Sequence, residues 1–181
     1  MQMEWYNEPR RWAGDHRQLQ VTVEPDTDYW RVTHYNFIRD SGPFCFTTVS
    51  GDFEANVKIS GAWQELYHQA GLMIRTDAAN WIKTGIEYVD GVQQVSAVVT
   101  REVSDWSVVP RQDNPAAIWI KLLRKGDYVQ ISYSFDQAHF ALLRLAYFTP
   151  QVSVQIGLVA AAPGSLPFEA LFEDFTVVPV S

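Results

Sequence analysis

The sequence predicts an all-β fold in which two antiparallel sheets pack face to face as a jelly-roll-type β-sandwich. Short runs of alternating apolar and polar residues recur along the whole chain, with turn residues between them. The central segment, 67–100, divides into three such runs joined by two tight turns. No window longer than two helical turns combines a 3.6-residue apolar period with helix caps.

The first third of the chain contains a series of short predicted strands. Residues 1–14 are expected to form an irregular lead-in that holds one short strand, and residues 61–67 a linker. Turn signals such as Glu24-Pro25-Asp26 separate the runs. The run 52–60 alternates at every position, so one face must meet water and the other a core. The predicted strands are 19–23, 29–35, 44–49 and 52–60.

The central segment can be registered residue by residue. Asp90-Gly91 suits a two-residue type I′ turn, which pairs Glu87 with Gln94 and Gly85 with Ser96. The preceding turn, 76–80, pairs Arg75 with Trp81, Met73 with Lys83, Gly71 with Gly85 and Gln69 with Glu87. A slip of one residue would move a whole apolar set to the opposite face, so the pattern fixes the register. The predicted core face comprises Ala70, Leu72, Ile74, Ile82, Thr84, Ile86, Val95, Ala97 and Val99.

The remainder of the chain continues the strand pattern. The segment 101–110 follows the central hairpins, and Gln112–Pro115 is a predicted loop. His139–Phe148 is ambiguous because Leu and Ala favour helix. Its position directly after a tight turn leads us to predict a strand. The strands expected here are 117–123, 128–135, 139–147, 152–160 and 168–178.

Composition limits the classes of protein to consider. The 181 residues suffice for a single domain, 1–181, and 47% of them are hydrophobic. A net charge of −7 without a Lys/Arg cluster argues against nucleic acid and anionic membranes as partners. One cysteine, Cys45, excludes an internal disulfide. With no leader-like segment at the start, we expect a cytoplasmic protein.

The face of the central strands opposite the predicted core shows the most informative pattern. Gly71, Gly85 and Ser96 form a cross-strand row that has almost no side chains. Glycine within a strand often marks close approach by a ligand or by another backbone. Either another segment packs on this floor, or a ligand lies in a trough above it. The candidate ligand-binding residues are Gln69, Gly71, Arg75, Trp81, Lys83, Gly85, Glu87, Gln94, Ser96 and Trp106.

Five segments of the chain show a recognisable pattern, namely Asp28–Trp30, Gln69–Met73, Trp81–Tyr88, Ser104–Ser107 and Phe168–Phe175. They resemble a bacterial and fungal family of unknown function, domain of unknown function 1349, whose fungal member is named for regulation of enolase. The resemblance covers nearly the whole chain and implies a concanavalin A-like lectin/glucanase fold. One departure is His68, where the family usually has aspartate. The resemblance implies little about function, because one fold hosts many functions.

The predicted trough gives little support for an enzyme. Most glycosidases need two carboxyl groups about 5–10 Å apart. Glu87 is the only carboxylate in the trough, its cross-strand neighbours are the amides Gln69 and Gln94, and Lys83 would lie roughly 13 Å along the strand. A second carboxylate would have to come from a loop, for instance Asp105 or Asp77. A polysaccharide lyase is a weaker alternative, because this register places no Tyr/His pair.

The sequence contains no recognisable cofactor or metal motif. The four histidines, His16, His34, His68 and His139, lack metal-ligand spacing. No glycine-rich phosphate loop and no serine nucleophile elbow is present. We therefore expect no catalytic residues, no metal and no cofactor.

The pattern favours a non-catalytic binding domain. Trp81 and Arg75, with Gln69, Glu87 and Gln94 across the glycine floor, supply an aromatic face and hydrogen-bonding groups for a glycan or another small polar ligand. The alternative is a protein-interaction or regulatory module, which would show an exposed apolar face instead of a polar trough.

Overall fold

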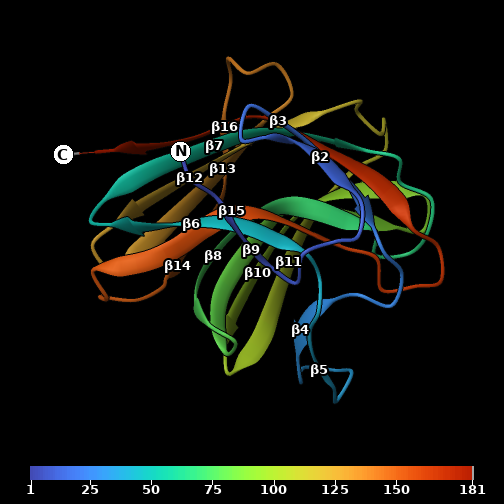
Figure 1. The fold of residues 1–181 in the computed structure, drawn as a ribbon, viewed down its shortest axis with the longest axis horizontal. Helices are drawn as coiled ribbons and strands as arrows, with labels where there is room; N and C mark the ends of the chain where they lie inside the picture. Colours follow the sequence, from blue (N-terminus) through green and yellow to red (C-terminus); the bar gives the residue numbers. More distant parts are fainter. Residues whose placement is uncertain (181) are drawn as a thin grey trace.

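The computed structural model describes residues 1–180 as two seven-stranded antiparallel sheets packed face to face, with a separate two-stranded hairpin at one side (Figure 1). This confirms the predicted all-β sandwich. Within the run 139–147, which was ambiguous between helix and strand, strand β14 covers Ala141–Tyr147. Residues 1–180 contain no helix that is long and apolar enough to cross a membrane.

The first sheet contains the central segment of the sequence. Its strands, in spatial order, are β1 (Glu4–Tyr6), β6 (Phe44–Ser50), β15 (Ser153–Ala161), β8 (Gln69–Asp77), β9 (Asn80–Val89), β10 (Val92–Arg101) and β11 (Val103–Arg111). The register of β8, β9 and β10 is the predicted one, including the pairs Gln69–Glu87, Gly71–Gly85 and Gly85–Ser96. Alternation and turn chemistry were therefore sufficient to fix the register of three adjacent strands.

The second sheet covers the apolar face of the first. Its strands, in spatial order, are β14 (Ala141–Tyr147), β13 (Tyr128–Ser134), β12 (Ile118–Lys125), β7 (Phe53–Gly61), β16 (Phe168–Pro179), β3 (Gln18–Val23) and β2 (Trp12–Asp15). Its apolar side chains, such as Phe53, Ile120 and Phe172, join Leu72 and Ile82 in one core cluster. The predicted core face of the central strands is thus confirmed.

The hairpin departs from the prediction of one strand over 29–35. The strand β4 (Tyr29–Arg31) is short, the chain reverses over residues 32–37, and β5 (Ile38–Asp40) returns beside it. In Figure 1 the two strands lie apart from both large sheets, beside the end of the first. The reversal was missed because residues 32–37 contain neither Gly nor Pro.

The hairpin and the strands near it bury part of the face that was expected to be an open trough. Trp81, fully buried, packs edge-on against Tyr29 of the hairpin, with ring centroids 6.0 Å apart. Trp81 and Tyr29 belong, with Met73 and Val98, to a second hydrophobic cluster that is separate from the core between the sheets. The trough prediction is therefore wrong for this half of the face, where another segment covers the strands.

The glycine row serves close approach of two backbones. An added Cβ at Gly85 would collide with the Ala70 carbonyl oxygen and would lie 2.6 Å from the Gly71 Cα. A Cβ at Gly71 would lie 2.8 Å from the Gly85 Cα. A side chain at either position would therefore meet the neighbouring strand and would not extend into an open trough.

We predict that Gly85→Val lowers the free energy of unfolding by about 1–3 kcal/mol, because strands β8 and β9 would have to move apart to accept the side chain. Thermal and urea unfolding measure the loss. Ser96→Ala is the matched control, since it occupies the same cross-strand row and adds no atoms. Equal stability of Gly85→Val and the parent would show that the strands have room to separate.

Candidate functional site

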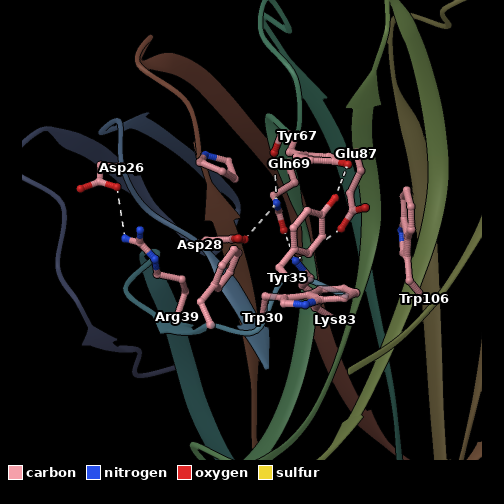
Figure 2. Close-up of a pocket in the computed structure, with 12 residues that line it drawn as sticks. Asp26, Asp28, Trp30, Tyr35, Arg39, Tyr67, Gln69, Lys83, Glu87 and Trp106 are labelled. Carbon is pink, nitrogen blue, oxygen red and sulfur yellow. Dashed lines mark hydrogen bonds and ion pairs between the residues drawn. The ribbon is translucent and has the colours of Figure 1, made fainter. Parts of the chain in front are cut away.

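A cavity of about 240 Å³ lies between the hairpin and the part of the first sheet where β8 begins and β9 ends. Figure 2 shows its side chains converging from the hairpin on one side and from the first sheet, including Trp106 of β11, on the other. Most of the surface that lines the cavity is apolar, with charged groups at its floor. The lining residues are Asp26, Asp28, Trp30, Tyr35, Phe37, Arg39, Tyr67, Gln69, Lys83, Glu87, Trp106 and Pro163.

The floor consists of three buried polar side chains from β8 and β9. The Lys83 ammonium donates to the Gln69 amide oxygen and lies 3.4 Å from the Glu87 carboxylate. The expected separation of roughly 13 Å between Lys83 and Glu87 is wrong for the side-chain ends. Because Gly85 has no side chain between them, Lys83 can extend along the strand until its ammonium reaches the carboxylate.

The Gln69 amide connects the floor to the hairpin. Its NH₂ group donates to the Tyr67 carbonyl at 3.0 Å and lies 3.5 Å from a carboxylate oxygen of Asp28. The same Asp28 oxygen accepts the backbone N–H of Tyr29 at 2.7 Å. A chain of polar contacts therefore runs from Glu87 through Lys83 and Gln69 to Asp28.

Aromatic rings form a continuous wall above this floor. The centroid distances are 5.8 Å from Trp30 to Tyr35, 6.5 Å from Tyr35 to Tyr67 and 6.3 Å from Tyr67 to Trp106. The Tyr35 and Tyr67 hydroxyls are 2.7 Å apart. This hydrogen bond and burial raise the pKa of Tyr67 to about 12, so the phenol stays neutral at physiological pH. The wall thus offers apolar faces with uncharged hydroxyls.

The backbone of the wall is held in an uncommon conformation. Val32, His34 and Asn36 at the hairpin tip, and Tyr67 before β8, all have φ between +56° and +66°. A β-branched residue such as Val32 is rarely found there, because its Cβ crowds the backbone. Such residues cluster at binding and catalytic sites, where the surrounding structure holds them in place.

A buried ion pair fixes the hairpin against the sheet. Arg75 of β8 donates two hydrogen bonds, of 2.6 and 2.8 Å, to the Asp40 carboxylate at the end of β5. Burial alone lowers the pKa of Arg75, but the hydrogen bonds and charge of Asp40 outweigh it and raise that pKa. The Tyr6 ring lies 4.5 Å from the guanidinium. On the other side, the backbone N–H of Arg31 donates to Ser104 at 2.9 Å.

His68 supports the pocket wall from behind. Its buried ring stacks on Phe168 with centroids 4.5 Å apart, and Nε2 lies 2.9 Å from the Leu166 carbonyl. The backbone N–H groups of Gln64 and Glu65 point at Nδ1 from 3.3 and 3.4 Å. This arrangement requires a neutral ring that accepts at Nδ1 and donates from Nε2. Burial lowers the pKa of His68 and favours that state.

The structure brings together four of the ten predicted site residues, Gln69, Lys83, Glu87 and Trp106. Gly71, Gly85 and Ser96 line only a narrow cleft of about 10 Å³ beside it. Trp81 and Arg75 are buried away from the pocket, so neither can present a face to a ligand there. Gln94 is half-buried opposite Pro110 and does not line the pocket.

The residues that sequence reasoning missed belong to the hairpin and the linker. Trp30, Tyr35 and Phe37 come from a ten-residue stretch, 28–37, that contains four aromatic residues. This high density of aromatic residues was the available signal. The prediction of one strand over 29–35 did not recognise it as the wall of a pocket. Asp28 adds a carboxylate that the predicted trough lacked. Asp77 and Asp105 do not line the pocket, so neither supplies the second carboxylate that a glycosidase would need beside Glu87.

The site is chemically suited to accepting and donating hydrogen bonds. Glu87 faces an ammonium and Asp28 accepts a backbone N–H, so both carboxylates act as acceptors. Neither is arranged as the proton donor that glycoside hydrolysis requires. Among residues 1–180, no group of three or more His, Cys, Asp or Glu side chains could hold a metal ion.

Comparison with known proteins identifies similar chains. The family described as "Protein of unknown function (DUF1349)" matches residues 5–180. "Regulation of enolase protein 1" from Saccharomyces cerevisiae is 32% identical over 173 residues, which cover 96% of this chain and 87% of the yeast protein. A crystal structure of a functionally unknown protein from the same yeast superposes with a TM-score of 0.94 at 31% identity, covering 99% of this chain and 98% of that one.

A more distant similarity concerns the fold alone. The carbohydrate-binding module CBM66 from Bacillus subtilis superposes with a TM-score of 0.57 at 16% identity. The match covers 96% of this chain and 94% of the module.

We predict that the stability of the protein falls as the pH is lowered below about 6.5, the ordinary pKa of histidine. His68 has a lowered pKa in the folded state, so protons bind the unfolded chain first and favour it. The stabilisation is complete above the ordinary pKa and is lost as the pH falls through the lowered one.

Melting temperatures between pH 7.5 and 5 measure this effect, because carboxylates ordinarily titrate below this pH range. His68→Gln should flatten the decline relative to the parent, and His16→Gln, which changes a partly exposed histidine in the turn between β2 and β3, should not. Comparing variants with the parent also cancels the opposite contribution of His139, whose pKa is raised by its hydrogen bond with Asp136. Identical pH profiles for His68→Gln and the parent would contradict the assigned role.

Proposed function

The chain belongs to the DUF1349 family, and from the geometry of its pocket we propose that it binds a carbohydrate, as a single sugar ring, without catalysing a reaction. The observation that carries this proposal is the aromatic wall of Trp30, Tyr35, Tyr67 and Trp106 standing over the floor of Gln69, Lys83 and Glu87. Sugar rings have C–H-rich faces that lie on aromatic rings, and hydroxyl groups that both donate and accept hydrogen bonds.

The floor has hydrogen-bonding capacity left for such a ligand. Lysine has three N–H donors, and Gln69 and Glu87 engage two of those of Lys83. One Glu87 oxygen faces Lys83, which leaves the other to accept from a ligand. A neighbouring donor and acceptor suit two adjacent hydroxyl groups of a sugar. The Tyr35 and Tyr67 hydroxyls add further partners at the wall.

The dimensions of the pocket favour a small ligand. Its volume of about 240 Å³ lies below the roughly 300–1,000 Å³ that is usual for drug-sized molecules. One sugar ring, either free or at the end of a longer chain, suits this volume better than an extended oligosaccharide. Because CBM66 is similar in fold alone, the proposal depends on the pocket of this chain.

We predict that Glu87→Gln and Trp106→Ala each weaken sugar binding at least tenfold, equivalent to about 1.4 kcal/mol. Glu87→Gln removes the charge that pairs with Lys83, and Trp106→Ala removes one end of the aromatic wall. Calorimetry and saturation-transfer NMR with D-glucose, D-galactose, D-xylose and D-fructose, free and as chain ends, measure binding.

Trp12→Ala is the matched control, because Trp12 is similarly exposed but lies on β2 of the second sheet. Trp106→Ala should melt near the parent temperature, since Trp106 belongs to no core cluster. Glu87→Gln leaves the buried Lys83 ammonium without its carboxylate and should melt at a lower temperature, so its binding is measured well below that temperature. Absence of binding by the parent across the panel would overturn the proposal, as would equal losses for Trp12→Ala and Trp106→Ala.

A second candidate function is a regulatory contact with enolase, which the name of the yeast relative favours. The structure offers a surface for it at the edge strands β11 and β14. These edges adjoin, because Arg144 of β14 donates to the Ser107 hydroxyl of β11 at 2.5 Å. Val103, Leu142 and Leu145 are each more than half exposed there, and exposed apolar patches often mark protein contacts.

For this second function we predict that purified enolase binds the parent protein. A double variant, Leu142→Asp with Leu145→Asp, should bind enolase at least tenfold more weakly, because charged side chains would replace the apolar contact. Light scattering and biolayer interferometry measure the complex. Leu66→Asp is the control, being similarly exposed elsewhere. An equal effect of the control and the double variant would exclude these edges as the contact surface.

A further inference from the structure

We infer that the pocket selects uncharged sugars and rejects those that carry a carboxylate or phosphate, with Asp28 as the specificity-determining residue. This inference rests on the proposed function and adds the class of ligand. It follows from which of the charged groups that line the pocket have a partner of opposite charge and which do not.

Both cations of the pocket have carboxylate partners within the protein. The Lys83 ammonium lies 3.4 Å from Glu87 and is buried with it at the floor. The Arg39 guanidinium lies 3.2 Å from Asp26 at the exposed rim. An anionic ligand could meet either cation only by competing with a carboxylate that is already in place. The pocket therefore offers an anion no unmatched positive charge.

Asp28 adds a negative charge without a cation beside it. The contacts of its carboxylate are the backbone N–H of Tyr29 and, at 3.5 Å, the Gln69 amide. Both are uncharged donors, and both meet the same oxygen, Oδ1. The other oxygen is left for a ligand, and it can accept from a hydroxyl group. A carboxylate or phosphate in the same place would meet like charge, which costs binding energy.

The surroundings reinforce this preference. Three carboxylates and two cations line the pocket, which gives it a net charge of −1 (two minus three), and the whole chain carries −7. Residues 1–180 contain no helix, so no helix N-terminus offsets this negative field. Two of the groups that make the discrimination, Glu87 and Lys83, are buried, where water and salt screen charges less than at the surface.

The test compares matched pairs of sugars that differ in one group: D-glucose with D-glucuronate and glucose 6-phosphate, and D-galactose with D-galacturonate. Calorimetry or saturation-transfer NMR at low salt should show each neutral sugar binding the parent at least tenfold more tightly than its anionic counterpart. Raising the salt to about 0.5 M should narrow the ratio, because the repulsion is electrostatic.

Asp28→Asn should narrow the same ratio at least threefold, because it removes the charge that repels anionic sugars. The asparagine amide oxygen can still accept the Tyr29 N–H, so the variant should fold. The comparison of neutral with anionic sugars on the parent protein tests the inference without the variant. Asp127→Asn is the matched control. It removes the same charge from an exposed turn between β12 and β13, outside the pocket lining, and it should leave the ratio unchanged.

The outcomes separate this inference from the function on which it rests. If uronates or the phosphate bind the parent as tightly as neutral sugars, the pocket binds sugars but the inference is wrong. It is also wrong if Asp28→Asn leaves the ratio unchanged. If no sugar of either kind binds, the proposed function itself fails, and the inference fails with it.

Discussion

The bidentate pairing of Arg75 with Asp40 is the contact on which the pocket depends. It joins the middle of the first sheet to the end of the hairpin, and both partners are largely removed from water. A buried guanidinium is costly without its carboxylate, so the hairpin cannot leave this position without exposing or stranding a charge. Trp81 packs against Tyr29 in the same region, so an apolar contact and an ion pair both hold the hairpin in place.

The missing side chains of Gly71 and Gly85 have two effects on the site. The two strands come close enough that a single methyl group would not fit. The surface above them is left free for the Lys83 side chain, which crosses it to meet Gln69 and Glu87. A floor that looked like bare backbone in the sequence is therefore the route by which a lysine reaches a carboxylate. The glycines shape the pocket without lining it.

Sequence reasoning recovered what depends on alternation and turn chemistry. The register of β8, β9 and β10 was predictable because a one-residue slip would expose a whole apolar set. The hairpin was not, because its reversal uses Val32, His34 and Asn36 at positive φ, where glycine would have been the expected signal. Trp81 was misplaced for the same reason, since only the folded hairpin reveals which end of the sheet is covered. Lys83, Gln69 and Glu87 could be placed on one face of the sheet from the register, but the contact between them depends on side-chain length, which the register does not show.

The hairpin pairs with neither seven-stranded sheet, so the segment that supplies half of the aromatic wall contributes no ladder hydrogen bonds to the sandwich. Residues 32–37 meet one another mainly through local backbone bonds, such as that from the Asn36 N–H to the Val32 carbonyl. Substitution or exchange of this tip would therefore alter the shape of the cavity while the sandwich remained intact. Evolution, or a loop-grafting experiment, could retarget recognition in this way, much as antibodies vary their loops on a constant framework.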